Sequence, residues 1–486
     1  MVVPQDMEWV KRLNFETKPL QMTQIKFGTD GWRAIIARDY TIENVERITE
    51  GTARWMLKKG MKQTVIGYDC RFGGPMFTDT VISVLGNFGI KSIVSTHFSS
   101  TPMVSLAVVK TNSDLGIVIT ASHNPPSYNG FKLKSSYGGP SVPSDIADVE
   151  ALIPTTALTV LPSVADLKSQ GLVEVIDLEQ MYMDHIYESF DIDLIRNSGM
   201  KLAYDAMYGA GQNVIRRLFP DALLLHCDYN PSFMGQAPEP IARNLGALSS
   251  ALAENKCYSM GLANDGDADR IGLFDEDGKF VDSHHILLLL LYYLYEYKNL
   301  RGKVVITFSV TDKMKKLAEL YGLECEVTKI GFKYIAEIMT QEDVLVGGEE
   351  SGGLAVKGHI PERDGVWIGL MIMEFMAKTG KSLKQLISEV YAKVGPFDFD
   401  RDDLHLTNEI KDAVMTKCRE GKITSIGDRK VIRAEDTDGY KFYLSDDEFI
   451  MVRASGTEPL LRVYCQAPNS GEVRNILDMA RQTLLG

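Results

Sequence analysis

The chain has 486 residues, a formal net charge of −13, 45% hydrophobic residues and 24% charged residues. This length exceeds what one compact core holds and predicts three or four domains, and the composition is ordinary for a soluble globular protein. The negative charge argues against a general nucleic-acid or anionic-membrane binder, although a few arginines in a cleft could still bind an anionic substrate.

The cysteines and the apolar segments indicate the cellular setting. Six cysteines are scattered without C-x-x-C spacing, which indicates neither a zinc site nor a disulfide framework and favours a reducing cytoplasm. The longest apolar run, residues 286–295, is about half the length of a membrane span and predicts a buried helix. Residues 1–15 lack the apolar segment of a secretory signal. We therefore expect a cytoplasmic protein without a membrane segment.

The first part of the chain alternates between helix and strand patterns. A glycine-punctuated loop, residues 27–34, carries Arg33 and is compatible with a structural or a binding role. Helical spacing begins at Thr41, and a strand at 65–69, a helix at 76–88 and a strand at 115–119 follow. This order predicts a βαβ series, and hence a mostly parallel sheet covered by helices.

The strand at 115–119 leads into a polar loop that contains Ser122. Open α/β sheets place their chemistry at the carboxyl ends of strands, where this loop would lie. His123 and Asn124 supply donors beside the serine hydroxyl, and two prolines then deny the chain a helix. Ser122 could therefore be a nucleophile or carry a phosphoryl group, while a simple turn is the alternative for the tripeptide alone.

A second unit begins after a stretch rich in proline, serine and threonine that ends near residue 171. A helix at 178–190 and a strand at 200–205 open it, and we interpret the glycines at 209 and 211 as packing positions rather than as a phosphate loop.

The second unit contains three aspartates at alternate positions, Asp265, Asp267 and Asp269. In an extended loop their carboxylates would point to one side, and such a concentration of charge requires a cation, for which magnesium is expected. An EF-hand calcium loop is the alternative, but Arg270 stands where that loop requires glycine, and the flanks look like strands. Residues 275–278 predict a hairpin turn with solvated charges.

A third unit contains strands at 304–309 and 325–328 and a helix at 312–321. Lys333 follows at the start of a helix, where a solvated lysine is the simplest interpretation. Residues 344–353 are a strand and an acidic loop bounded by glycines, in which Glu349 and Ser351 could bind a sugar; a solvated acidic loop would look similar. Helices at 367–378 and 383–391 complete the unit.

The last unit follows a hinge-like segment at 395–399. A helix near residues 409–420, strands around 431–432 and 442–444, and a helix at 473–484 predict an α+β layer. Residues 453–462 combine guanidinium groups, hydroxyls and flexible backbone, which suits a phosphate: Arg453, Ser455, Gly456, Thr457 and Arg462.

Five of these stretches, in this order, resemble the motifs of the α-D-phosphohexomutase superfamily, which interconverts sugar 1-phosphates and sugar 6-phosphates. Residues 120–132, Thr-Ala-Ser-His-Asn-Pro-Pro-Ser-Tyr-Asn-Gly-Phe-Lys, resemble its phosphoserine loop. The stretches at 27–34, 265–270, 349–353 and 453–459 resemble its other loops. The resemblance implies an α/β protein with four domains around a central cleft, three related mixed α/β domains plus a smaller C-terminal α+β domain. The expected domains are residues 1–172, 173–283, 284–394 and 395–486.

The resemblance also implies roles for individual residues. Ser122 would carry the phosphoryl group, Arg33 would face it, and Lys132 or His123 would handle the proton of the attacking hydroxyl. The three aspartates and the serine phosphate would bind one Mg²⁺. The residues implied at the substrate are Arg270 in the cleft, Lys333 on phosphate, Glu349 and Ser351 on the ring hydroxyls, His359 and Arg363 nearby, and Arg453, Ser455, Gly456, Thr457 and Arg462 on the non-reacting phosphate.

The implied activity is that of a phosphoglucomutase, with glucose 1,6-bisphosphate as intermediate and activator and a hexose phosphate as substrate. Glu350 at the middle of the sugar loop is like the phosphoglucomutase version, where dual-specificity enzymes usually carry methionine and phosphoglucosamine mutases glutamine. Gly352 and Gly353 depart from the usual endings, so glucose and mannose stay open. A phosphomannomutase or dual-specificity enzyme, a sugar phosphatase, and a silent sugar-phosphate-binding protein are the alternatives. The protein is expected to be a monomer or dimer.

Overall fold

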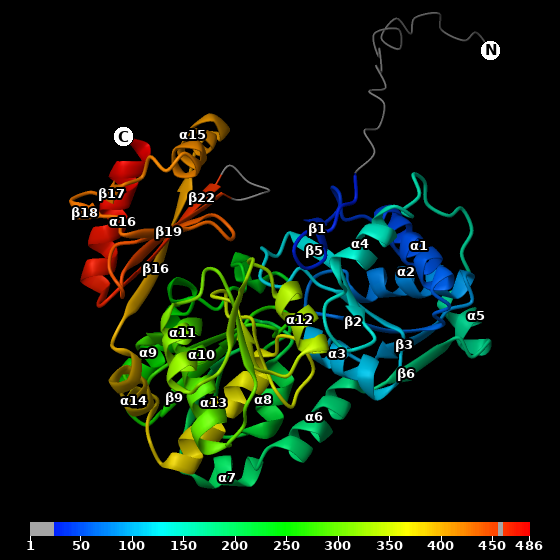
Figure 1. Cartoon of the computed structure of the whole chain (residues 1–486). Coiled ribbons are helices and arrows are strands. Elements are labelled where there is room, and N and C mark those ends of the chain that lie inside the picture. The colour runs from blue at the N-terminus through cyan, green and yellow to red at the C-terminus, as the bar shows by residue number, and fades with distance from the viewer. Residues whose placement is uncertain (1–23, 455–459) are drawn as a thin grey trace, which may run out of the picture.

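The computed structural model describes residues 24–454 and 460–486 and consists of four units in chain order (Figure 1). The first three units each contain a mixed sheet with helices, and the fourth is a smaller α+β unit at the red, C-terminal end. This arrangement confirms the predicted fold class. No helix in the described part of the chain has the length and apolarity that a membrane crossing needs.

The first unit is a six-stranded sheet in the order β1-β5-β4-β2-β3-β6. Its strands are β1 (Trp32–Ile35), β2 (Gln63–Tyr68), β3 (Lys91–Ser95), β4 (Leu115–Ile119), β5 (Tyr128–Ser135) and β6 (Val173–Ile176). Its helices are α1 (Ile42–Lys58), α2 (Gly74–Asn87), α3 (Thr101–Lys110), α4 (Pro143–Glu150) and α5 (Val164–Ser169). Strands β2, β3, β4 and β6 are parallel, as the βαβ pattern predicts. Because β6 pairs with β3, the sheet continues past the predicted boundary at residue 172.

Strand β4 is buried along its whole length because both faces of the sheet are covered. Ile117 and Ile119 belong to the core formed with α1 and α2, whereas Val118 belongs to the core formed with α3. A strand buried on both faces reads as a continuous apolar run rather than as an alternation, which is what residues 115–119 show. This burial holds the loop that follows at a defined place.

The second unit has a five-stranded sheet in the order β11-β10-β9-β7-β8. Its strands are β7 (Leu202–Asp205), β8 (Leu223–Leu225), β9 (Met260–Asn264), β10 (Ile271–Phe274) and β11 (Phe280–Val281), and its helices are α6 (Leu178–Ser189), α7 (Ile192–Asn197), α8 (Gln212–Leu218) and α9 (Gly246–Glu254). A Cβ atom added to Gly209 would lie 2.5 Å from the Asp265 carbonyl oxygen. Close packing therefore requires this glycine, in line with the interpretation above.

The third unit has a four-stranded sheet in the order β13-β12-β14-β15. Its strands are β12 (Lys303–Thr307), β13 (Cys325–Thr328), β14 (Val344–Gly348) and β15 (Leu354–Val356). Its helices are α10 (Ser283–Tyr292), continued by a π-helical segment (Tyr293–Tyr297), α11 (Lys313–Leu320), α12 (Phe332–Gln341), α13 (Gly365–Thr379) and α14 (Leu383–Val394). Residues 286–291 of α10 are 0% exposed, which confirms the predicted buried helix. The second and third units share one apolar core, which also includes the α3 side of the first unit.

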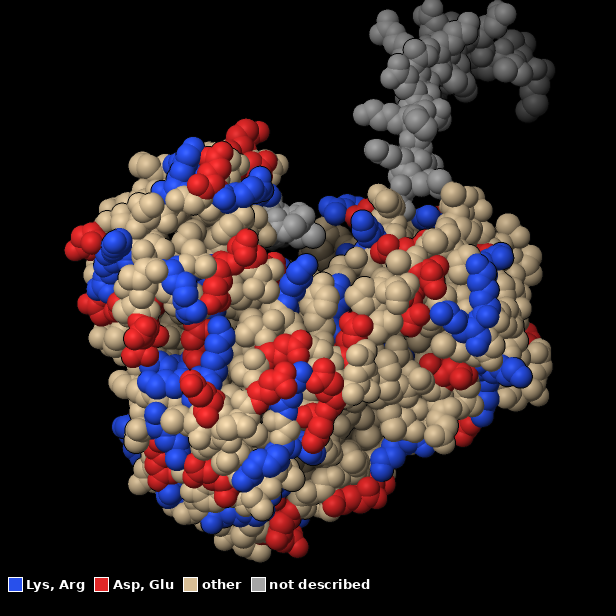
Figure 2. All heavy atoms as spheres, in the orientation of Figure 1, with Lys and Arg blue, Asp and Glu red and all other residues tan. Residues whose placement is uncertain are grey.

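The fourth unit has an antiparallel sheet in the order β16-β22-β21-β20-β19 and its own core. Its strands are β16 (Asp398–His405), β17 (Ser425–Ile426), β18 (Arg429–Lys430), β19 (Arg433–Glu435), β20 (Tyr440–Tyr443), β21 (Phe449–Ala454) and β22 (Leu460–Ala467), and its helices are α15 (Asn408–Arg419) and α16 (Ser470–Leu485). The strand expected around residues 431–432 is divided into two short strands, β18 and β19, which these two residues connect. Figure 2 shows the surface hollowed between this unit and the first one.

Candidate active site

Ser122 lies at the carboxyl end of β4 and is 0% exposed. Its backbone is left-handed, with φ of 52°, an uncommon conformation for a residue other than glycine. The Ser122 amide donates to Thr120 Oγ1 at 2.8 Å, and the Ser122 hydroxyl donates to Asp265 Oδ2 at 2.7 Å. His123 Nδ1 lies 3.3 Å from the same hydroxyl oxygen. The serine loop of the first unit thus meets the aspartate loop of the second.

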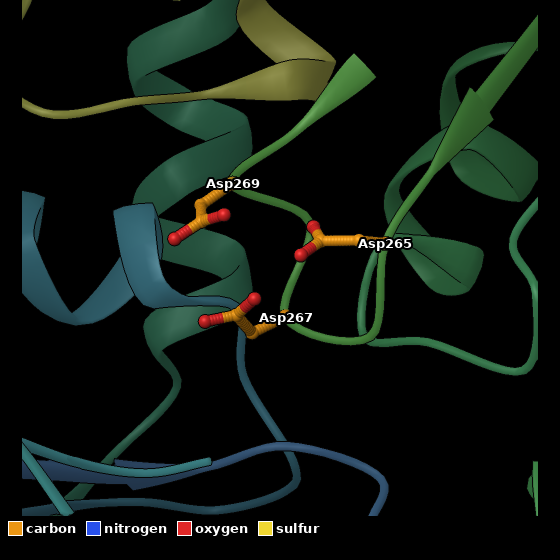
Figure 3. Close-up of side chains that lie close together, drawn as sticks. All are labelled: Asp265, Asp267 and Asp269. Carbon is orange, nitrogen blue, oxygen red and sulfur yellow. The ribbon is translucent and has the colours of Figure 1, made fainter. Parts of the chain in front are cut away.

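The three aspartates follow β9 in a tight loop that returns the chain into the antiparallel strand β10. The expectation of an extended loop is wrong: the Ala268 amide donates to the Asp265 carbonyl at 3.1 Å, and Ala268 has φ of 56°. The carboxylates converge because the loop curls around them, as Figure 3 shows. One oxygen from each of Asp265, Asp267 and Asp269 lies within 4.8 Å of the other two. Strands on both sides of the loop exclude the EF-hand alternative.

These three side chains fit a hard metal ion. All are 0% exposed, and neither Asp267 Oδ1 nor Asp269 Oδ1 has a hydrogen-bond partner within residues 24–454 and 460–486. Burial raises the pKa of Asp265 well above its usual range, and the charges of Asp269 and Asp267 add to this effect. Carboxylate oxygens are the ligands that Mg²⁺ prefers, and these two Oδ1 atoms have no hydrogen-bond partner in the part of the chain that the structure describes, so the donor set fits that ion.

Two buried cations face the aspartates from other units. Lys132 Nζ, on β5, lies 2.8 Å from Asp267 Oδ2 and 3.0 Å from Asp269 Oδ2. Arg363 Nη2 lies 2.7 Å from Asp269 Oδ2, and both cations also pair with Asp30. Burial opposes the charge of Lys132, but the three carboxylates outweigh burial and raise its pKa, so the ammonium stays protonated.

His123 has the opposite electrostatic environment. Burial lowers the pKa of His123 well below its usual range, and the nearby cations Arg270, Arg33 and Lys132 lower it further. Its imidazole is therefore neutral at physiological pH. Arg33, on β1, donates to Asn124 Oδ1 at 2.7 Å and so contacts the serine loop, while Arg270 Nε is buried without a hydrogen-bond partner among the described residues. An unpaired buried guanidinium nitrogen is suited to an anion.

In the acidic loop after β14, Glu349 and Glu350 have different neighbours. Glu349 is 5% exposed, and its Oε2 lies 3.9 Å from Arg363 Nη1. Burial raises the pKa of Glu349 to about 7, against the attraction of Arg363. Glu350 instead accepts a hydrogen bond from Ser309 and, at 3.5 Å, one from the Tyr464 hydroxyl of the fourth unit. Ser351, next to it, lines a cavity of about 400 Å³ between the second, third and fourth units.

Two further predicted residues lie outside the carboxylate cluster. Lys333, in the first turn of α12, lines a cavity of about 150 Å³ together with Asp30. His359 is in a packed cluster: its Nε2 lies 2.9 Å from Asp364 Oδ2, its ring stacks on Trp367 at 3.8 Å, and its side chain is 2% exposed. The structure thus brings Arg363, but not His359, together with the aspartates.

The C-terminal arginines lie directly opposite each other, Arg453 on β21 and Arg462 on β22. Arg453 Nε donates to Asp438 Oδ1 at 3.3 Å, and Arg462 Nε lies 3.8 Å from Asp403 Oδ1. Asp438 and Asp403 offset the like charges of this cross-strand pair. Two guanidinium groups side by side are also suited to a phosphate. The other residues predicted here, Ser455, Gly456 and Thr457, lie outside the described residues.

Sequence reasoning missed several residues of the site, namely Asp30, Asp69, Arg71 and Thr101. Asp30 lies in the glycine loop of residues 27–34, where Arg33 alone was predicted as a site residue. The Thr101 hydroxyl and amide both donate to Asp267. Asp69 and Arg71 follow the strand β2 that neighbours β4. A polar pair at the carboxyl end of an adjacent parallel strand was the signal that could have found them.

Models of all four domains of the phosphoglucomutase/phosphomannomutase family match the chain, at residues 24–159, 180–278, 282–394 and 409–483. The chain is 29% identical over 464 residues to phosphoglucomutase/phosphomannomutase of Thermococcus kodakarensis, covering 94% of this chain and 98% of that protein. It is 28% identical over 478 residues to phosphoglucosamine mutase of Limosilactobacillus fermentum, covering 95% and 98%.

A solved structure from Thermus thermophilus, described as a putative phosphomannomutase, superposes with a TM-score of 0.85 at 31% identity and covers 96% of this chain and 100% of that one. The chain therefore belongs to the phosphoglucomutase/phosphomannomutase family and is an enzyme of the phosphohexomutase class. This confirms the family that the sequence motifs predicted. The names of the relatives differ in the sugar, so the glucose preference stays a prediction.

Proposed function

We propose that the enzyme interconverts hexose 1-phosphates and hexose 6-phosphates through a phosphoserine at Ser122. The observation that carries this proposal is the buried Ser122 hydroxyl, 2.7 Å from the Asp265 carboxylate. Phosphorylated Ser122 transfers its phosphoryl group to the free hydroxyl of a hexose monophosphate, so that the serine O–P bond breaks as the sugar O–P bond forms. The resulting hexose 1,6-bisphosphate turns end for end and returns its other phosphoryl group to Ser122.

The charged side chains around Ser122 bind the metal ion and accept the proton. Asp265, Asp267 and Asp269 hold the Mg²⁺, which when bound offsets the charge of the transferring phosphoryl group. His123 accepts the proton of the attacking hydroxyl, because it is neutral and lies 3.3 Å from the serine oxygen. Lys132 is a weaker candidate for this base, since its carboxylate partners keep it protonated.

The substrate is bound by residues from the other loops. Arg33 and Arg270 face the reacting phosphate, while Arg453 and Arg462, with Ser455, Gly456 and Thr457, grip the other phosphate. Glu349 and Ser351 bind the ring hydroxyls, and Lys333, which lines the cavity beside Asp30, binds substrate phosphate. His359 packs on Trp367 and pairs with Asp364, so we assign it no contact with substrate. Glucose phosphates are the proposed substrates because residues 349–351 match the phosphoglucomutase version of the loop. Glucosamine and mannose phosphates are the second candidates, since relatives carry those names.

A comparison of three substrates tests the sugar assignment. With Mg²⁺ and a trace of glucose 1,6-bisphosphate, we expect kcat/KM for glucose 1-phosphate to exceed that for mannose or glucosamine 1-phosphate by about tenfold or more. Preference for glucosamine 1-phosphate would overturn the sugar and leave the mutase mechanism in place. Release of inorganic phosphate without isomerisation would support a phosphatase, and no turnover of any of the three would contradict the mutase proposal.

Glu349 predicts a pH dependence of sugar binding. Its pKa of about 7 lies above that of a free glutamate, so the protonated form is favoured in the folded protein, and its stabilising contribution is lost as pH rises through 7. Sugar hydroxyls need the ionised acceptor, so binding changes in the opposite direction. Between pH 8 and pH 6 the ionised fraction falls about tenfold, and we expect kcat/KM to fall by about that factor.

The variant Glu349→Gln separates this effect from titration of the substrate phosphate. It should bind substrate more weakly at pH 8 but show a flatter kcat/KM profile between pH 6 and pH 8 than the wild type. Glu254→Gln, on the exposed surface of α9, should keep the wild-type profile. Parallel profiles for the wild type and Glu349→Gln would show that Glu349 is not the titrating acceptor.

A further inference from the structure

The guanidinium of Arg71 lies within the serine loop and is 0% exposed. All of its long-range hydrogen bonds given by the structure go to backbone carbonyls of one short segment. Nη1 donates to Pro125 O at 2.8 Å and to Tyr128 O at 3.1 Å, and Nη2 donates to Ser122 O and Asn124 O at 2.6 Å each. One side chain thus donates to four carbonyls between residues 122 and 128, of which the Pro125 carbonyl also accepts from the Tyr128 amide.

The serine loop needs such a partner because its own backbone supplies few donors. Pro125 and Pro126 have no amide hydrogen, and Ser122 has a left-handed backbone that its side chain does not favour. Carbonyls that point away from water are costly unless a donor reaches them. The planar guanidinium presents several N–H groups in a fixed fork, so it can reach neighbouring carbonyls that the single nitrogen of lysine cannot.

Arg71 is itself held in place from two sides. Asp69 lies 3.2 Å from Arg71 Nε, accepts from the Arg71 amide at 2.9 Å, and accepts from the Thr120 hydroxyl at 2.5 Å. Thr120 Oγ1 in turn accepts from the Ser122 amide, which closes a circuit of contacts around the serine. On the other side, the Phe233 ring of the second unit lies 5.1 Å from the guanidinium.

The aspartate loop passes beside the same contacts. A Cβ atom added to Gly266 would lie 2.5 Å from the Ser122 carbonyl oxygen and 3.6 Å from Arg71 Nη2. The backbone that carries two of the aspartates is therefore packed against the carbonyl that Arg71 holds. A shift of that carbonyl would alter the distance between the Ser122 hydroxyl and Asp265.

We propose that Arg71 is a positioning residue for phosphoryl transfer, which holds the serine loop so that the Ser122 hydroxyl faces the aspartates. This inference rests on the proposed function, in which Ser122 carries the phosphoryl group. Arg71 contacts neither substrate nor metal in this role. It acts through the backbone of residues 122–128, because in-line transfer depends on placement of the reacting oxygen to within a fraction of an ångström.

The test compares Arg71→Lys with a matched control, Arg47→Lys. Arg47 is a second buried arginine of the first unit, 7% exposed, whose Nε donates to the Pro154 carbonyl at 2.8 Å. For Arg71→Lys we expect kcat to fall about 100-fold while KM stays within about threefold. Amide hydrogen exchange in a peptide spanning residues 119–131 should be at least about tenfold faster in Arg71→Lys. Arg47→Lys should show neither change, even where its melting temperature falls similarly.

Each result decides the role of Arg71. Wild-type kcat in Arg71→Lys, or wild-type exchange in residues 119–131, would overturn the proposal, as would an equal loss of kcat in Arg47→Lys. If the wild-type protein turned over no hexose phosphate, that result would contradict the proposed function alone. The exchange measurement would then still establish or reject Arg71 as the residue that orders the serine loop.

Discussion

Replacing Ser122 with alanine should lower mutase turnover by about 10⁴-fold or more, because the variant lacks the oxygen that carries the phosphoryl group. The hydroxyl donates to Asp265 and lies in a fully buried position, so water is poorly placed to substitute for it. The measurement is kcat for conversion of glucose 1-phosphate, with intact-mass detection of the phosphorylated protein after incubation with glucose 1,6-bisphosphate. The wild type should gain one phosphoryl group and Ser122→Ala none.

Two other hydroxyls serve as comparisons for Ser122. Ser127 is exposed in the same loop, and Ser127→Ala should keep near-wild-type kcat. The Thr101 hydroxyl also donates to an aspartate of the site, Asp267, and is the rival acceptor. If Ser122→Ala still became phosphorylated and Thr101→Val did not, the assignment of the nucleophile would be wrong.

Replacing Asp265 with asparagine should lower kcat by about 10²–10³-fold at saturating substrate and weaken Mg²⁺ binding. The change keeps an oxygen that can accept from Ser122 but removes one of three buried, like-charged carboxylates. Since that removal relieves repulsion, the metal-free variant should melt no lower than the metal-free wild type, so activity and stability should respond in opposite directions. Activity assays and thermal melts, with a chelator and after adding Mg²⁺ back, measure both effects.

The matched control for Asp265 is Asp275, an aspartate at the end of β10 that is 5% exposed. Its Oδ1 accepts from the amides of Asp277 and Lys279, so Asp275→Asn can keep these bonds and should keep both activity and Mg²⁺ binding. Full activity of the wild type after exhaustive chelation, or of Asp265→Asn, would contradict a metal site at the three aspartates.

Asp275 also shows why local sequence is an incomplete guide to burial. The sequence correctly indicates a hairpin at residues 275–278, because a polar turn ending in glycine stands between two apolar stretches. The same pattern predicts solvated charges, yet Asp275 is buried because the turn packs its carboxylate over its own backbone amides. Around residues 431–432 the one strand expected is two short strands, β18 and β19. The chain passes there from one sheet to another, since the Val431 amide donates to the Thr424 carbonyl and the Ile432 amide to the Tyr443 carbonyl.

The sequence by itself identified those residues of the site that lie close together along the chain. Ser122, the three aspartates and the arginines of β21 and β22 each belong to a short run that follows or lies within a strand. Residue type and local pattern made them candidates, and the resemblance of these runs to family motifs implied their roles. The order of helix and strand patterns likewise predicted α/β units, because that order reflects short-range periodicity.

Only the tertiary structure decided which side chains complete the site. Arg363 meets Asp30 from 333 residues away, and Arg71 reaches the carbonyl of Ser122 from 51 residues away. It also decided that His359 packs on Trp367 instead of joining the aspartates, and that Glu350 contacts Tyr464 of the fourth unit. The physical reason is that these contacts form only when the four units pack against one another. Burying a charged side chain is costly, so the stable arrangement places an oppositely charged group beside it.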